Sequence, residues 1–406
     1  MNGTQPWPQK FFAMIWSGVF LLILGCDRPP FAQIEPLEPD RLAALSKPPK
    51  PYTQDATLIA VGDIMMHGSQ IKSGYNYSTK TYNYDAFFTE VREIIKTGDW
   101  AIGNLETTLA GPETGYTGYP LFNAPDTLAD AIKNAGFNIL TTANNHSLDR
   151  GEKGVIKTLE NVKSRDLVPV GTAASQSEAD KIKVIEKNEI SMALLAYTYG
   201  TNGIPIPAGK DYLVSLIDEA EIVKDIIEAR QLGVDVVTVA LHFGTEYQRQ
   251  PNAQQKQLVG QLVKAGADIV LGSHPHVVQP YEIFDLTGEG GQPRQAVAIY
   301  SMGNFISNQR GNYKDLGVIF KVKIEKQFPD ETIKIAAVEA LPTWVHRYWL
   351  NGKQNFRILP LEAVLSAQND PLLKSGDYSR IARDLEQMNR HLESFKSSKN
   401  TAQLRQ

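Results

Sequence analysis

The chain contains almost no cysteine. Cys26 is the only thiol among its 406 residues, so an intrachain disulfide is excluded. The chain also lacks an excess of basic residues, since 41 Lys and Arg are balanced by 45 Asp and Glu, with a formal net charge of −4 and a pI near 6.0. A broad basic surface is therefore not expected, and we predict no nucleic-acid partner.

Several catalytic motifs are missing as well. The sequence has no GxxxxGK[ST] loop and no GxSxG turn. With the single thiol close to the amino terminus, these absences argue against nucleotide-triphosphate chemistry and against covalent serine or cysteine catalysis. The sequence also shows no internal repeat and no low-complexity block.

The amino-terminal segment has the pattern of an export signal. Lys10 is followed by an apolar run over residues 11–25, which is short for a membrane span and typical of a secretory signal. The run ends in the sequence ILGC, which resembles the bacterial lipobox and ends at Cys26. We therefore predict a lipoprotein that is exported and anchored by lipidated Cys26 to the outer face of the bacterial cytoplasmic membrane. The alternative is an uncleaved anchor.

Prolines and hydrophobic patterning divide the rest of the chain. Residues 27–55 contain seven prolines, which favour extended backbone, so this segment is predicted to be a tether. A folded domain is expected over residues 56–345. A C-terminal extension is expected over residues 346–406, with a charged helix beginning near residue 374.

Apolar runs and amphipathic stretches alternate in the predicted domain. Continuous apolar runs are typical of strands buried on both faces, and they occur at 56–61, 100–103, 138–142, 192–197, 234–241, 269–271 and 296–300. Helical spacing occurs at 86–96, 127–134, 154–163, 218–232 and 253–265. This alternation predicts a layered α/β domain. A late strand pair is expected at 316–324 and 332–340.

Six short segments each follow a predicted strand and carry side chains that bind metal ions or transfer protons. Five of the seven histidines lie in these segments: His67, His146, His242, His274 and His276. Because open α/β sheets bind ligands at the carboxyl ends of their strands, these turns are expected to converge on one site.

The carboxylates and the amide in these turns also fit ordinary roles. Asp63 and Glu106 lie at strand ends, where each could bind a metal. In the alternative interpretation, Asp63 caps a turn and Glu106 is a solvated loop carboxylate. Asn145 and His146 offer an amide ligand and a proton donor from one turn. Asp149 either orients His146 or caps the following helix.

The histidines give the stronger signal. His274 and His276 are two residues apart at a strand end, so their side chains project to the same side and can bind neighbouring cations. His242 follows the preceding strand. His67 lies four residues after Asp63 and is either a metal ligand or a polar loop residue. Carboxylates, imidazoles and an amide together suit divalent Mn, Fe or Zn, and could hold a pair of ions.

In order along the chain, the motifs resemble the signature of the capsule-synthesis CapA family, the poly-gamma-glutamate capsule proteins. They are GD at 62–63, GNLE at 103–106, NNHSLDRG at 144–151, HFGTEY at 242–247, GSHPH at 272–276 and YSMGNF at 300–305. The resemblance spans about residues 57–320. The family is related to the calcineurin-like metallophosphoesterases, which implies a four-layered α/β/β/α sandwich with a two-metal site.

The resemblance implies roles for the first group of ligands. Asp63 and His276 would bind one metal, and Glu106 stands where phosphoesterases place a bridging aspartate. Two motifs depart from the phosphoesterase pattern. Its Asp-x-His is represented here by Asp63 and His67, and its GDxxD is GNLE, so the number of metals and phosphatase activity stay open.

The resemblance also implies ligands for a second metal. Asn145, His242 and His274 resemble its ligands, and His146 would act near the leaving group. Glu246 and Tyr247 follow His242 closely, and with Asn304 they are candidates for substrate contact or for orienting the ligands. The loop over residues 111–122 either lines the cleft or is a surface insertion.

Two functions fit these observations. The first is an envelope-anchored, metal-dependent hydrolase in the synthesis of poly-gamma-glutamate capsule or another envelope polymer, in which metal-activated water hydrolyses a phosphoester or related bond. The second is a non-catalytic factor that keeps the fold and tethers or exports an anionic polymer. Both imply the membrane, and capsule synthesis or export proteins, as partners.

Overall fold

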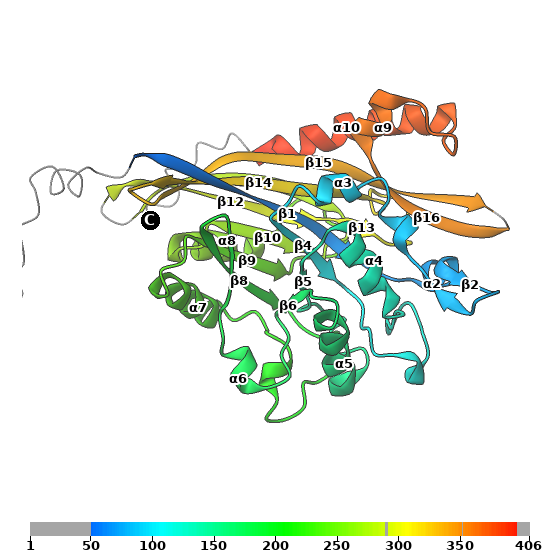
Figure 1. Ribbon diagram of the computed structural model, residues 1–406, viewed down its shortest axis with the longest axis horizontal. Coiled ribbons are helices and arrows are strands. Elements are labelled where there is room, and N and C mark those ends of the chain that lie inside the picture. Colours follow the sequence, from blue (N-terminus) through cyan, green and yellow to red (C-terminus); the bar gives the residue numbers. More distant parts are fainter. Residues whose placement is uncertain (1–49, 289–290, 351, 396–406) are drawn as a thin grey trace, which may run out of the picture. The chain divides into compact units, whose positions relative to one another are not determined.

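Strand β1 (Tyr52–Ile64) shows how the layers are built. Its side chains alternate between two cores, as the period of a strand requires. Leu58 and Ala60 face one core, and Ile59 and Val61 face the other. The computed structural model describes residues 50–288, 291–350 and 352–395 (Figure 1).

The first sheet has eight strands and contains β1. The others are β4 (Trp100–Leu105), β5 (Ile139–Thr141), β6 (Val168–Val170), β13 (Asn304–Ile306), β14 (Leu316–Phe328), β15 (Thr332–Leu350) and β16 (Lys353–Pro360). Their order is β16-β15-β14-β1-β4-β5-β6, with β13 paired to β1. β4, β5 and β6 continue parallel to β1, whereas β14 pairs with it in the antiparallel sense.

The second sheet has six strands. They are β7 (Lys183–Lys187), β8 (Ile190–Thr198), β9 (Val236–His242), β10 (Ile269–Ser273), β11 (Val278–Thr287) and β12 (Pro293–Met302). Their order is β11-β12-β10-β9-β8-β7, with parallel pairs in the middle and an antiparallel strand at each edge.

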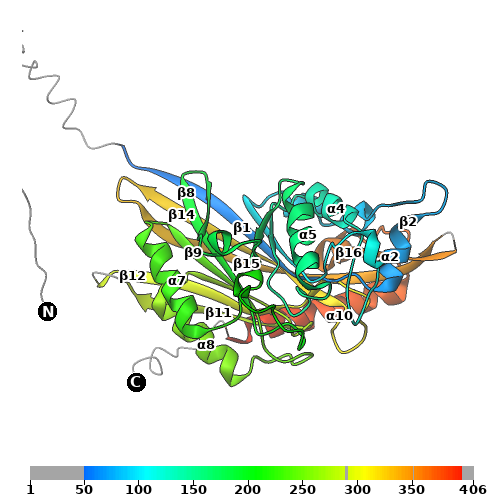
Figure 2. The same ribbon diagram turned by 90° about the horizontal axis from the view of Figure 1, so that it is seen from below.

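Helices cover the outer faces of both sheets. α4 (Thr127–Ala135) and α5 (Gly151–Lys163) pack on the first sheet, and α7 (Glu219–Gln231) and α8 (Ala253–Ala265) pack on the second. A separate apolar core joins the inner faces of the two sheets. In Figure 2, α7 and α8 lie beside β8 and β9, away from α4 and α5. The predicted four-layered α/β/β/α sandwich is confirmed.

Shorter elements fill the connections. They are α2 (Gly68–Gly74), β2 (Tyr75–Asn76), β3 (Thr81–Tyr82), η1 (Asp85–Phe87), α3 (Arg92–Ile95), η2 (Pro112–Thr114), α6 (Gln176–Ala179), η3 (Asp211–Leu213), α9 (Leu361–Ala367), α10 (Ser375–Leu392) and η5 (Glu393–Phe395). The single helix predicted over 86–96 is wrong, because η1 and α3 are separated by turns. Phe88 packs against Phe137 and Phe305, and such tertiary contacts override a short helical pattern.

Two predicted boundaries also differ from the structure. The predicted tether reached residue 55, but Tyr52 already belongs to β1, where it pairs with Phe328 and their rings stack at 4.5 Å. The predicted boundary after residue 345 falls inside β15, because Val345 pairs with Ile358 of β16. Residues 346–395 therefore contribute to the same unit.

The charged helix predicted near residue 374 is present as α10. Its apolar side chains Ile381, Met388 and Leu392 are buried in the core between the sheets. Cys26 and the segments 1–26 and 27–49 lie outside the described residues. Within the part of the chain that is described, no helix is both long and apolar enough to cross a bilayer.

A close approach of two glycines joins the sheets at one end. Gly303, with a φ of +67°, lies between β12 of the second sheet and β13 of the first. A Cβ atom on Gly62 would lie 1.9 Å from the carbonyl oxygen of Gly303. The backbone N–H of Asp63 donates to that oxygen at 2.9 Å. Only glycine at position 62 permits this approach, which fixes the end of β1 against the second sheet.

Candidate metal centre

The carboxyl ends of four strands from both sheets meet at this place. Asp63 lies in β1, Glu106 follows β4, His242 ends β9, and His274 and His276 follow β10. All five side chains belong to residues that are no more than 4% exposed. The convergence expected from the sequence is therefore present in the structure.

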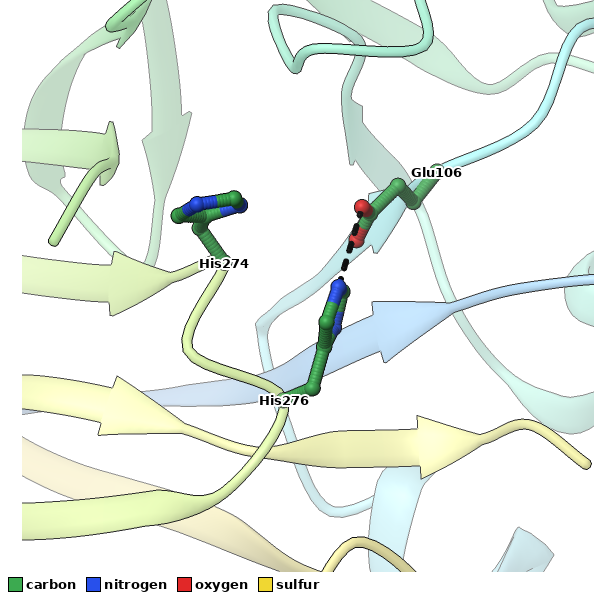
Figure 3. Close-up of side chains that lie close together, drawn as sticks. All are labelled: Glu106, His274 and His276. Atoms are coloured by element: carbon green, nitrogen blue, oxygen red, sulfur yellow. Dashed lines mark ion pairs between the residues drawn. The ribbon is translucent and has the colours of Figure 1, made fainter. Parts of the chain in front are cut away.

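The five side chains form two overlapping groups. Asp63, Glu106 and His242 make one group, and Glu106, His274 and His276 make the other, with the potential ligand atoms of each group within 4.8 Å of one another. Figure 3 shows the Glu106 carboxylate facing the space between the two imidazoles of its second group. Glu106 is therefore shared by the two groups.

Glu106 has an unusual environment for a carboxylate. Its Oε1 atom is buried and has no hydrogen-bond partner among the described residues. The same atom lies 3.6 Å from Nε2 of His242 and 3.8 Å from Nε2 of His276. Burial, and then the charge of Asp63, raise the pKa of Glu106 well above its usual value. A buried carboxylate oxygen without a partner is costly, and a divalent cation would satisfy it. These residues therefore fit a metal.

The imidazoles have the protonation state that a metal ligand needs. Burial lowers the pKa of His274 to about 4 and that of His242 well below its usual value, with His274 contributing to the second shift. Both rings are therefore neutral at pH 7, as metal coordination requires. Nδ1 of His242 lies 2.9 Å from Oγ of Ser273, an outer contact of the kind that leaves Nε2 to face a metal.

Backbone geometry around the histidines is strained. His274 and His276 have φ angles of +97° and +57°. Such conformations cost of order 1–3 kcal/mol each for residues other than glycine, and they persist only where the surroundings enforce them. Here Asn304 Nδ2 donates to the carbonyl oxygen of His276 at 3.2 Å. Asn304 therefore positions a histidine through its backbone.

Hydrogen bonds orient the carboxylate of Asp63. Nδ2 of Asn104 donates to Oδ1 at 2.8 Å, and Nδ1 of His276 lies 2.9 Å from Oδ2. With Nδ1 bonded in this way, Nε2 of His276 is the ring nitrogen that faces Glu106. Asp63 thus both belongs to one group and orients a member of the other.

A pair of side chains, His146 and Asp149, lies beside the candidate metal ligands. Nδ1 of His146 is 2.7 Å from Oδ2 of Asp149, and the same oxygen accepts the backbone N–H of Phe122 at 2.6 Å. The Phe122 ring meets the His146 ring edge to face, with the ring centres 4.6 Å apart. Asp149 therefore orients His146 and leaves Nε2 available for proton transfer. The loop over 111–122 contacts this pair through Phe122.

Asn145 contributes the amide that the sequence suggested. Its Oδ1 atom lies 2.9 Å from Nε2 of His242. The amide oxygen thus faces the group formed by Asp63, Glu106 and His242, where it can serve as a ligand.

The structure does not bring His67 into either group. Its Nδ1 atom accepts the backbone N–H of Asn308 at 3.3 Å, and its ring lies 5.4 Å from that of Phe122. Glu246 and Tyr247 are exposed beside the centre, with the Tyr247 ring 6.1 Å from that of His276. Neither residue belongs to a ligand group.

Two neighbours of the centre were not singled out from the sequence. The Tyr199 ring packs against that of His274 at a tilt of 46°, with the ring centres 4.6 Å apart, and Asn202 bonds Asn145. Both lie just after β8. A signal was present, because Asn202 and Gly203 form an Asn-Gly pair, typical of a tight turn, immediately after a buried strand.

Comparisons with known proteins show which family the chain matches. Residues 57–309 match the family described as "Bacterial capsule synthesis protein PGA_cap". The "Capsule biosynthesis protein CapA" of Bacillus anthracis is 31% identical over 266 residues, covering 62% of this chain and 60% of that protein. The "PGA biosynthesis protein CapA" of Bacillus subtilis (strain 168) is 32% identical over 268 residues, covering 64% of this chain and 66% of that protein.

The matched region thus spans less than two thirds of the length of either relative. Among solved structures, the calcineurin-like phosphoesterase YfkN from Bacillus subtilis aligns with a TM-score of 0.42 at 14% sequence identity, covering 83% of this chain and 98% of that one.

Proposed function

The chain belongs to the bacterial capsule synthesis (PGA_cap) family, and we propose that it is a membrane-anchored, metal-dependent hydrolase of capsule or envelope polymer synthesis. The observation that carries the proposal is the position of Glu106, which belongs to both groups of buried ligands and whose Oε1 atom has no hydrogen-bond partner among the described residues. The names of the two Bacillus relatives support a role in capsule synthesis.

The ligands would be divided around Glu106. The structure groups these side chains differently from the resemblance, because Asp63 stands with His242 and His276 stands with His274. Asp63, His242 and the amide oxygen of Asn145 would hold one ion, His274 and His276 would hold a second, and Glu106 would be available to both. Divalent Mn, Fe or Zn suits this mixture of oxygen and nitrogen. When bound, such ions activate water and stabilise negative charge on a phosphoester or similar substrate.

The protein's own side chains supply the proton transfer. His146 would hold a proton on Nε2 and donate it to the leaving oxygen, while Asp149 holds Nδ1 and stabilises the charged ring. Because His146 and Asp149 are only 4% and 5% exposed, solvent competes weakly for that proton.

The amino-terminal segment would anchor the chain to the membrane. Lipidated Cys26 would attach the chain to the outer face of the cytoplasmic membrane, and the proline-rich segment that follows would act as the tether. An anionic envelope polymer or its phosphoester precursor is the substrate, and capsule synthesis or export proteins are the partners.

A second candidate is a non-catalytic factor that keeps the metals and tethers or exports an anionic polymer. The burial of the centre favours it, since a substrate has little direct access to side chains that are at most 4% exposed. In this case the metals would stabilise the junction between the two sheets.

Hydrolysis assays separate the two candidates. The purified full-length chain, loaded with Mn²⁺, is incubated with a panel of phosphoesters and gamma-glutamyl peptides. Hydrolysis that requires the metal and is lost in His276→Ala supports the first candidate, the metal-dependent hydrolase. A chain that binds metal with its expected ligands and hydrolyses none of the panel contradicts it and favours the second candidate.

A further inference from the structure

One side chain on the solvent side of the centre contacts two of its functional residues. Asn202 lies in the loop after β8, and its Oδ1 atom accepts a hydrogen bond from Nδ2 of Asn145 at 3.1 Å. Its own Nδ2 atom lies 3.5 Å from each ring nitrogen of His146. Asn202 therefore links the amide ligand to the candidate proton donor.

The contact with Asn145 decides which end of that amide faces the metal groups. The terminal torsion of an asparagine is soft and has two broad orientations. One presents an oxygen and the other presents an NH₂ group, which repels a cation. With Nδ2 of Asn145 bonded to Asn202, Oδ1 faces inward and lies 2.9 Å from Nε2 of His242.

The loop that carries Asn202 is held against the centre at both ends. The backbone N–H of Tyr199 donates to the carbonyl oxygen of His242 at 3.0 Å, and the Tyr199 ring packs against that of His274 at a tilt of 46°. Beyond Asn202, Ile204 and Ile206 pack against the buried apolar cluster that includes residues of α5. The side chain of Asn202 is therefore presented from a fixed base.

The backbone at this position also suits asparagine. Asn202 has a φ of +52° and Gly203 has a φ of +75°. Asparagine enters the left-handed region more easily than other residues with a Cβ atom. The residue thus meets two requirements, a left-handed turn and an acceptor directed at Asn145.

We propose that Asn202 is a positioning residue of the metal centre, which holds the Asn145 amide with its oxygen toward the metal. This inference rests on the proposed metal-dependent function. Outer contacts of this kind typically change metal affinity by 10-fold to 100-fold.

Two substitutions separate positioning from folding. Asn202→Gly removes the side-chain amide and accepts the left-handed backbone, so it adds no strain of its own. Asn202→Asp keeps an oxygen acceptor for Nδ2 of Asn145. A matched control is Asn188→Gly in the turn between β7 and β8. Asn188 has a φ of +50° and bonds Asp55 and Asp99 instead of the centre.

Mn²⁺ binding to the metal-depleted full-length chain is measured by calorimetric titration, with unfolding temperature recorded for each variant. We expect Asn202→Gly to weaken binding by about 10-fold, and Asn202→Asp and Asn188→Gly to bind within about threefold of the wild type. Wild-type affinity in Asn202→Gly overturns the inference, as does equal weakening in Asn188→Gly. If His276→Ala also binds Mn²⁺ like the wild type, the metal centre itself is wrong and the inference fails with it.

Discussion

Oδ2 of Asp63 and Nδ1 of His276 lie 2.9 Å apart although 213 positions separate them in the sequence. Asp63 belongs to the first sheet, and His276 follows a strand of the second. The centre is therefore assembled by the packing of one sheet on the other, and any change that separates the sheets at this end should also disperse the ligands.

Gly62→Ala tests that dependence. The added Cβ atom would lie 1.9 Å from the carbonyl oxygen of Gly303, so the end of β1 must move away from the second sheet. We expect a loss of about 3 kcal/mol or more in the free energy of unfolding, the upper end for overpacked sites, together with weaker metal binding. Urea unfolding followed by circular dichroism measures the first.

Gly260→Ala is the matched control. Gly260 lies inside α8 and a Cβ atom there meets nothing within 4 Å, so the substitution should be neutral or stabilise by up to about 1 kcal/mol. If Gly62→Ala is as stable as this control, the close approach of the two backbones does not hold the sheets together.

Asp149→Asn tests the proton-transfer pair. The carboxylate accepts from both His146 and the backbone of Phe122, and an amide would keep the shape but lose the charge that stabilises protonated His146. We expect kcat on a phosphoester that the wild type hydrolyses to fall by about 100-fold, with metal content unchanged. Steady-state kinetics and metal analysis of the same samples measure both. Unchanged kcat would remove this pair from the mechanism.

His346 makes stability depend on pH away from the metal centre. Burial, and then the neighbouring charge of Arg357, lower its pKa to about 4. The unfolded chain takes up this proton below about pH 6.5, but the folded chain takes it up only below about pH 4. The contribution of His346 to the free energy of unfolding is therefore fully present above about pH 6.5, and it is lost as the pH falls toward 4.

The expected size is about 2 kcal/mol between pH 7 and pH 5, from the linkage relation. It is measured as the difference between the wild type and His346→Gln in urea unfolding with a chelator present. Glutamine can still accept the hydrogen bond that Arg357 Nε donates at 3.0 Å. A difference that stays constant over this pH range would contradict the buried, neutral state of His346.

Much of the fold could be predicted from the pattern of apolar and polar residues in the sequence. The helix expected at 253–265 has those bounds in the structure, because a capping asparagine and a terminal glycine frame it. The strands β6, β7, β11, β13 and β16, and the short pair β2 and β3, were not predicted. β7 and β11 are edge strands with partly polar sequences, and β16 pairs with the end of a long hairpin. Such strands are defined by their partners more than by their own residues.

The site was predictable where its residues follow buried strands. Asp63, Glu106, His242, His274 and His276 do so, and parallel strands bring their ends together. Tyr199 and Asn202 could not be inferred with the same reasoning, since their roles depend on a loop whose path is set by packing on α5. His67 follows β1 by three residues, but the chain turns into α2 and directs it toward Phe122.

The most direct measurement is calorimetric titration of Mn²⁺ into the metal-depleted full-length chain, comparing the wild type with Glu106→Gln and with His391→Gln. His391 lies apart from both ligand groups and bonds the backbone of Val278. The two-group arrangement predicts that the wild type and His391→Gln bind alike, and that Glu106→Gln, which changes both groups at once, binds at least about 100-fold more weakly. Equal binding by all three proteins, or no binding by the wild type, would contradict it.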